Sequence, residues 1–301
     1  MRKTNDLGRD PVFRLVCRLA IPTMLAQLVS VLYSIVDRIY IGNIQGIGDL
    51  ALAGVGVCGP IVTLLSSFAS LVGLGGSPIM AMRMGEGRDR EAGRVLSNSF
   101  LMLCVCSVAL MAVVFPLRQP MLMAFGASDA TYGYANTYFT VYLCGTVFNL
   151  LALGLNQFII CQGYARKGMI SVMLGAALNI VLDPVFIFVF GMGVSGAALA
   201  TAISQCISFG ILFFQSLLRK DCVHLKPGKI TLSLSLYGEI LHGGIPSLCR
   251  QGVASIATAA LNLAANPFGD AAIAALSIVS RYMMFIGSAM IGFGQGFQPV
   301  C

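Results

Sequence analysis

The sequence predicts an all-α integral membrane protein whose helices cross the bilayer several times. Hydrophobic residues make up 57% of the 301 residues, charged residues only 10%, and the mean hydropathy is +0.86. A soluble domain carries roughly 25% charged residues, so this composition is that of a chain in lipid. The apolar stretches last for about 20 residues, the length that a helix needs to cross a bilayer. Strands of an outer-membrane barrel would alternate over about 10 residues.

Eight apolar stretches are long enough to span the membrane, and polar or charged loops separate them in order along the chain. The first lacks the small-residue cleavage site of a signal peptide, so we expect it to be retained. The eight predicted spans are 17–41, 51–79, 96–116, 135–161, 168–190, 194–218, 240–265 and 271–298.

The basic residues gather in alternate loops. Of the 19 Lys and Arg, 15 lie in the N-terminal tail, in the first turn of the first span, or after the second, fourth and sixth spans, whereas the opposite loops contain only Arg118. An excess of Lys and Arg marks cytoplasmic loops, so we expect a cytoplasmic N-terminus and no nucleic-acid partner. The fifteen residues are Arg2, Lys3, Arg9, Arg14, Arg18, Arg83, Arg88, Arg90, Arg94, Arg166, Lys167, Arg219, Lys220, Lys226 and Lys229.

An internal repeat is the most informative feature of the chain. The segment AIPTMLAQLV at 20–29 resembles GIPSLCRQGV at 244–253, and GLGGSP at 73–78 matches GQGFQP at 294–299 in both glycines and the proline. Six spans separate the two copies. Because that number is even, the copies run parallel and are related by an axis along the membrane normal.

The repeat predicts the domain organisation. We expect an N-terminal six-helix lobe at 1–220, a cytoplasmic linker at 221–239, and at 240–301 the first two helices of a second six-helix lobe. Completing the second copy would take roughly 140 more residues, so we expect the chain to be a fragment. The alternative is a natural eight-span protein with an accidental likeness.

An acid in the first span is the first candidate functional residue. Asp37 lies roughly 7 Å below the outer end of that span, where an unpaired carboxylate costs at least a few kcal/mol. Tyr33 and Ser30 share its helix face at i−4 and i−7. The neighbouring Arg38 points about 100° away, and we expect it to reach the outer headgroups.

Three further polar residues are predicted at a similar depth. Asn179 and Asp183 stand at i, i+4 on the fifth span, and Thr201 lies on the sixth, each roughly 10 Å below the outer surface. Two carboxylates, an amide and a hydroxyl suit a proton, because desolvation and a second carboxylate both disfavour the ionised acid. Oxygen ligands equally suit a hard cation such as Na⁺. The alternative is a purely structural set of contacts between helices.

Five segments make the chain resemble the multidrug and toxic compound extrusion (MATE) family, in particular a MepA-like bacterial branch. The likeness extends from about residue 11 to the end. The segments are IPTMLAQ, VDRIYIG, GLGGSPIMAMRMGEGR, LNIVLDPVFIF and GVSGAALATAISQ.

The resemblance implies twelve helices in two lobes, in a bacterial cytoplasmic membrane, and a protein that is monomeric at full length. Pro22, Tyr33, Asp37, Tyr138, Asn179, Asp183 and Thr201 match its first-lobe cation and proton network, and Asn156 matches a further polar position. Gln27, Arg250 and Gln251 are candidates for the substrate cleft. One sodium-coupled branch has an acid where this chain has Ala254, so a second-lobe cation site of that kind is in doubt.

The function that we expect is cation-coupled antiport, in which H⁺ or Na⁺ flows inward and amphipathic, often cationic compounds leave the cytoplasm. We expect no other cofactor, no further metal site and no enzymatic reaction; ATP hydrolysis would need a GxxxxGK[ST] loop, which does not occur. Two alternatives remain. One is a flippase for lipid-linked sugar precursors, which would need several basic residues in its cavity. The other is a fragment that does not transport.

Overall fold

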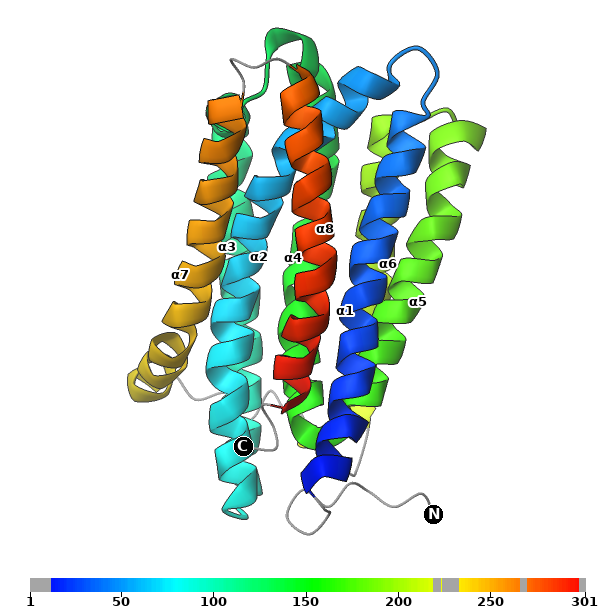
Figure 1. Ribbon diagram of the computed structural model, residues 1–301. Helices are drawn as coiled ribbons and strands as arrows, with labels where there is room; N and C mark the ends of the chain where they lie inside the picture. Colours follow the sequence, from blue (N-terminus) through cyan, green and yellow to red (C-terminus); the bar gives the residue numbers. More distant parts are fainter. Residues whose placement is uncertain (1–11, 219–222, 224–232, 266–269, 298–301) are drawn as a thin grey trace.

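The computed structural model describes residues 12–218, 223, 233–265 and 270–297. Within these ranges the chain is helical almost throughout (Figure 1). Most of the predicted linker 221–239 lies outside the described residues. So do several basic residues on which the predicted orientation depends, namely Arg2, Lys3, Arg9, Arg219, Lys220, Lys226 and Lys229.

The described residues form eight α-helices, one for each predicted span, and the predicted all-α class is confirmed. The helices are α1 (Val12–Gly42), α2 (Gly48–Gly85), α3 (Asp89–Ala124), α4 (Asp129–Ile159), α5 (Ala165–Pro184), α6 (Val194–Leu218), α7 (Leu234–Ala265) and α8 (Asp270–Phe297).

Two helices depart clearly from the predicted bounds. The expected end of the third span at residue 116 was too early, because α3 continues through Pro116 and Pro120 to Ala124. Membrane helices tolerate proline when neighbouring groups satisfy the backbone that it frees. The expected start of the seventh span at residue 240 was too late, since α7 begins at Leu234.

Two π-helical turns interrupt the helices of the fourth and fifth spans. One covers Ile160–Tyr164, where Gly163 adopts φ 82°, and joins α4 to α5. The other covers Val185–Val189 and follows Pro184 directly. Proline lacks the N–H that an α-helix requires, and π turns are frequent at functional sites. The second turn comes directly after the buried Asp183 and the proline.

Five continuous helical stretches among the described residues are long and apolar enough to cross a membrane. One of them holds both α4 and α5, so the five stretches contain α1 to α6. They are Leu15–Gly42, Gly48–Gly85, Asp89–Ala124, Asp129–Val189 and Val194–Leu217. The protein is therefore a multi-pass membrane protein.

The helices stand side by side and alternate in direction (Figure 1). We call the end of the bundle where α1 begins the N-side, and the other end the opposite side. Within α1 to α6, α2 packs on α3 and α4, α4 on α6, and α5 on α1 and α6. Fully buried side chains such as Phe139, Leu143 and Phe158 of α4 fill the interior.

The last two helices rest on the first two with a symmetry that the repeat predicts. α7 runs in the direction of α1 and packs on α2, while α8 runs in the direction of α2 and packs on α1 (Figure 1). Exchanging the two copies of the repeat turns the first contact into the second. The parallel arrangement of the copies is confirmed.

Glycines bring these helix pairs close together on the N-side. A side chain at Gly75 of α2 would collide with the backbone of Ile240 and Gly244 in α7. A side chain at Gly296 of α8 would collide with the backbone of Ala20 in α1. Gly75 matches Gly296 in the repeat, and Gly244 matches Ala20, so equivalent positions meet at both seams.

Candidate functional site

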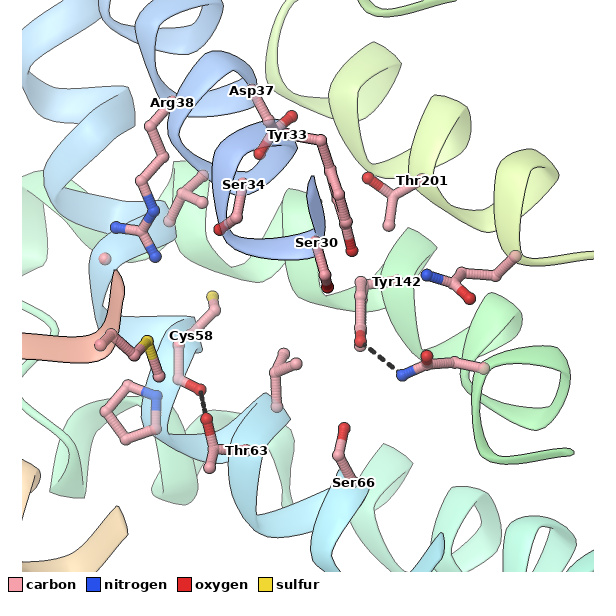
Figure 2. Close-up of a pocket in the computed structure, with 18 of the residues that line it drawn as sticks. Ser30, Tyr33, Ser34, Asp37, Arg38, Cys58, Thr63, Ser66, Tyr142 and Thr201 are labelled. Atoms are coloured by element: carbon pink, nitrogen blue, oxygen red, sulfur yellow. Dashed lines mark hydrogen bonds between the residues drawn. The ribbon is translucent and has the colours of Figure 1, made fainter. Parts of the chain in front are cut away.

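A cavity of about 970 Å³ extends from the opposite side of the bundle, at Phe125 and Gly126, to Asn156 and Leu212 in the N-side half. Helices α1, α2, α4, α5 and α6 supply its polar wall, which includes Asn179 and, as Figure 2 shows, Tyr33 and Thr201. α7 and α8 supply a mainly apolar wall that includes Leu261 and Met283, with Ser255 and Thr258 of α7 as its polar residues. A cavity with one polar and one apolar wall suits an amphipathic ligand.

The four residues predicted to form a cation site meet beside this cavity. Asn179 Nδ2 lies 3.2 Å from Asp183 Oδ1 on its own helix and 3.2 Å from Thr201 Oγ1 on α6. The carboxyl groups of Asp37 on α1 and Asp183 on α5 lie within hydrogen-bonding reach of each other. Three helices thus place two acids, an amide and a hydroxyl in one cluster.

The cluster is almost fully buried, so an ionised side chain in it is costly. Asp183 is 0% exposed, Asn179 1% and Asp37 8%. Asp37 lines the cavity, whereas Asp183 lies behind it. Two carboxylates this close in a low-dielectric site do not both stay ionised unless a cation lies between them. Without a cation, one of them holds a proton.

Two oxygen atoms of the cluster remain available to a ligand. Asn179 Oδ1 and Asp183 Oδ2 are buried and meet no hydrogen-bond donor from the described part of the chain. Carboxylate, amide and hydroxyl oxygens are ligands that hard cations prefer. The residues present therefore fit a proton or Na⁺, and they do not distinguish the two.

Local sequence explains the geometry on α5. A spacing of four residues puts Asn179 and Asp183 on one helix face, where the amide can donate to the carboxylate. Pro184 and the π turn at Val185–Val189 follow at once. A side chain at Gly196 of α6 would collide with Phe186, so this glycine lets the start of α6 approach the π turn.

Tyrosines border the cluster on the cavity side. Tyr33, one helical turn before Asp37, lies near both acids and within hydrogen-bonding reach of Ser30 and Gln205. Tyr138, from α4, lies near Asp37 and stacks on Tyr142, with ring centroids 6.0 Å apart. The structure thus brings Tyr33 and Tyr138 to the cluster, as the sequence predicted.

Sequence reasoning did not single out the next pair along α4. Asn149 Nδ2 donates to the Tyr142 hydroxyl over 3.0 Å, and both residues line the cavity (Figure 2). The spacing of seven residues on one helix was the available signal.

Two predicted supporting residues lie farther from the cluster. Pro22 lies inside α1 in its N-side half, and the helix continues without a break through it. Asn156 lines the end of the cavity nearest the N-side, and its buried Oδ1 has no partner among the described residues. The structure brings neither residue to the acids.

The three predicted cleft residues do not line the cavity. Gln27 Nε2 instead donates to Gln295 Oε1 of α8 over 3.0 Å. Arg250 is exposed on α7, and its neighbour Gln251 is half-buried. Their proposed contact with a substrate stays a prediction.

Arg38 requires a correction. We expected its side chain to reach the outer headgroups, but it points into the cavity, away from Asp37 on the other side of α1 (Figure 2). The reason is space on α2. Gly56 and Gly59 carry no side chains there, and the guanidinium lies over them.

Comparisons with known proteins agree with this architecture. The MatE family model matches residues 22–185. The multidrug export protein MepA of Staphylococcus haemolyticus is 27% identical over 294 residues, which cover 96% of this chain and 64% of MepA. The chain thus spans about 64% of the length of this curated relative.

Solved structures show the same fold. An outward-facing multidrug resistance MATE family transporter of the MOP superfamily superposes with a TM-score of 0.87 at 25% identity, covering 100% of this chain and 67% of that one. A MOP superfamily transporter from Pyrococcus furiosus, described as having a binding pocket of reverse polarity that suggests a different function, superposes with a TM-score of 0.89 at 26% identity. The superposition covers 98% of this chain and 66% of that transporter.

Proposed function

Because the chain belongs to the MATE family of membrane transporters, we propose that it carries the ion-coupling site and one wall of the substrate cleft of a multidrug exporter. The observation that carries this proposal is the cluster of Asp37, Asp183, Asn179 and Thr201 beside a cavity of about 970 Å³. A proton or Na⁺ would bind at the cluster, and an amphipathic compound would bind in the cavity.

The proposed orientation puts the N-side in the cytoplasm of a bacterium, with the chain in the cytoplasmic membrane. Basic residues of the described chain support this orientation, because Arg83, Arg88 and Arg94 lie around the α2–α3 turn and Arg166 lies at the start of α5, all on the N-side. The glycine seams close the N-side, while the cavity reaches the opposite side at Phe125 and Gly126 and extends inward to Asn156. We therefore assign the structure to the outward-facing half of a transport cycle.

The proposed cycle couples the cluster to α1. A cation arriving from outside would neutralise the Asp37–Asp183 pair and remove the repulsion between α1 and α5. Pro22 lets α1 bend, because proline removes one backbone hydrogen bond. Thr23 follows Pro22, and its hydroxyl lies 2.9 Å from Ala20 O and 2.6 Å from Gly292 O of α8. Bending there would move α8 with α1.

The proposed organisation follows the repeat. Residues 1–220 form the lobe that binds the ion, 221–239 connect the lobes, and 240–301 belong to a second lobe that completes the cleft. We propose a monomer as the transporting unit. The substrates would be small amphipathic compounds, for which the export function of the staphylococcal MepA relative is support.

A flippase for lipid-linked sugar precursors is the second candidate. Such a protein needs several basic side chains for a pyrophosphate. Among the described residues that line the cavity, Arg38 is the one basic side chain, whereas Asp37 and a polar stripe line the rest of the first-bundle wall. Export of compounds with a smaller charge therefore fits the cavity better.

Transport by reconstituted protein tests the proposal. The chain, expressed from its gene, is placed in liposomes that contain the dye ethidium, and a proton or sodium gradient is imposed. Gradient-driven movement of the dye supports cation-coupled export and identifies the ion. Dye movement that ignores both gradients would contradict it.

A further inference from the structure

Arg38 places a positive charge in the wall of the cavity. The residue is half-buried on α1, and its side chain reaches across the cavity toward α2 (Figure 2). A methyl group at Gly59 would lie 3.5 Å from Arg38 Nη2, and one at Gly56 would lie 4.0 Å from Nη1. A methyl group would fit at both distances, so only a larger side chain at these two glycines would displace the guanidinium from the slot above α2.

The described residues give this guanidinium no carboxylate partner. Each ion pair within the described ranges belongs to Arg83 or Arg88 on the N-side. The preceding residue, Asp37, points to the other side of α1 (Figure 2), and its carboxyl group lies within hydrogen-bonding reach of Asp183. The charge of Asp37 acts on the guanidinium, but no described carboxylate forms an ion pair with it, and a half-buried guanidinium in this situation favours an anionic ligand.

The surroundings of Arg38 are those of an amphipathic ligand site. Gly56 and Gly59 expose the α2 backbone below the guanidinium. Across the cavity, Leu261 of α7 and Met283 and Met284 of α8 present apolar surface. Methionine side chains adapt to ligands of different shape. Guanidinium groups bind carboxylates and phosphates in a bidentate fashion.

We propose that Arg38 determines substrate specificity by binding an anionic group, so that the cavity favours amphipathic compounds that carry a carboxylate, sulfonate or phosphate. The proposal rests on the proposed function, since it takes the cavity to be the substrate cleft. The family resemblance implies substrates that are often cationic, whereas this proposal favours substrates that carry an anionic group. The anion would lie over Gly56 and Gly59, and the apolar part of the compound would lie against α7 and α8.

A matched pair of dyes tests the proposal by binding alone. Rhodamine 110 carries a free carboxylate, and rhodamine 123 is its methyl ester. Binding of each to the purified full chain in a neutral maltoside detergent is measured by fluorescence polarisation. We expect rhodamine 110 to bind about tenfold more tightly, a difference typical of one charged contact. Equal affinities for the two dyes would overturn the proposal.

Variants connect the preference to the side chain. Arg38→Gln should remove the preference by weakening rhodamine 110 about tenfold while leaving rhodamine 123 nearly unchanged. Arg38→Lys should retain part of it, because an ammonium binds anions without the bidentate geometry. Gly59→Leu keeps the charge but fills the slot, and it should reduce the preference also. If both Arg38→Gln and Gly59→Leu still prefer rhodamine 110, Arg38 is not the anion-binding group. If Arg38→Gln does not fold, the preferences of Arg38→Lys and Gly59→Leu for rhodamine 110 test the assignment instead.

Competition distinguishes the two sources of an anionic group. Dioctanoyl phosphatidylglycerol and dioctanoyl phosphatidylcholine are added to the complex with rhodamine 110. If neither lipid displaces the dye, the site binds soluble amphipaths. If phosphatidylglycerol alone displaces it, the site binds anionic headgroups as well. In both cases Arg38 is the group that binds the anion. Equal displacement by the two lipids would contradict charge recognition. Charge-selective binding of rhodamine 110 without gradient-driven transport of rhodamine 110 or ethidium in liposomes would leave this inference standing and reject the proposed function.

Discussion

At the scale of single residues, the buried acid on α5 is the feature that most needs a functional reason. Asp183 is 0% exposed and accepts one hydrogen bond from Asn179, and a second carboxyl group, that of Asp37, lies within reach. Acids inside membrane helices are expensive and are retained mainly for ion or proton traffic. A site for a proton or cation gives both acids a common purpose.

Neutralising either acid should uncouple transport. Asp37→Asn and Asp183→Asn keep the side-chain shape but remove the charge that holds the cation, so gradient-driven dye export by reconstituted protein should fall at least tenfold for each. Asp49→Asn, at an exposed acid in the first turn of α2, is the matched control and should retain full export. Full export by both cluster variants would reject the site.

The hydroxyl of Thr201 should contribute less than the acids. Thr201→Val keeps the volume but removes the acceptor for Asn179 Nδ2. A hydrogen bond between membrane helices is worth about 0.5–1 kcal/mol, so we expect that loss in unfolding free energy and a fewfold weaker ion dependence. Thr137→Val, at an exposed threonine of α4, controls for the substitution itself. An ion dependence that matches this control would show that Thr201 does not contact the ion.

The cluster could be predicted from the sequence, and the direction of Arg38 could not. Helical spacing puts Asn179 and Asp183 on one face, and counting residues from the span ends puts Asp37 and Thr201 at a similar depth. The same periodicity separates Arg38 from Asp37 but does not reveal what each faces. That depends on space left by Gly56 and Gly59 on another helix.

At the scale of elements, α1 and α8 form the unit through which the proposed ion site would act on the proposed cleft. Thr23 and Gln27 of α1 are hydrogen-bonded to Gly292 and Gln295 of α8. Asp37 belongs to the same helix as these two residues. A change at the acids can therefore reach the second copy of the repeat through one continuous helix.

A side chain at the α1–α8 seam should separate the two helices. Gly292→Val would bring the new side chain against the backbone of Met24, whereas Gly294→Val, two residues away on the same helix, meets open space. Overpacking costs about 1–3 kcal/mol, so Gly292→Val should lower the melting temperature in detergent and Gly294→Val should not. Equal melting temperatures would show that the seam is not closely packed.

The number and order of the helices could be predicted, but several ends could not. The third span was predicted to end at residue 116, yet α3 continues through Pro116 and Pro120 to Ala124. Proline stops an isolated helix, whereas packed neighbours and the bilayer favour continued helix. The π turn after Pro184 gave no separate signal in hydropathy.

At the scale of the whole molecule, the two seams and the cavity are the basis of the proposed outward-facing state. Equivalent glycine contacts close the N-side between α2 and α7 and between α1 and α8. The cavity lies between the same helices and extends from the opposite side to Asn156. The even number of spans between the copies predicted their parallel direction. Which helix faces meet depends on glycine positions whose contacts could be identified only from the placed helices.

The central claim is that the Asp37–Asp183 cluster exchanges a cation against substrate, and cation displacement measures it most directly. Rhodamine 110 is added to purified chain in weakly buffered detergent solution, and released protons and sodium ions are recorded with electrodes. Reciprocal coupling requires that substrate binding release about one cation from the native protein. The double variant Asp37→Asn/Asp183→Asn should bind the dye and release none. Equal cation release by the native protein and the double variant would contradict the account.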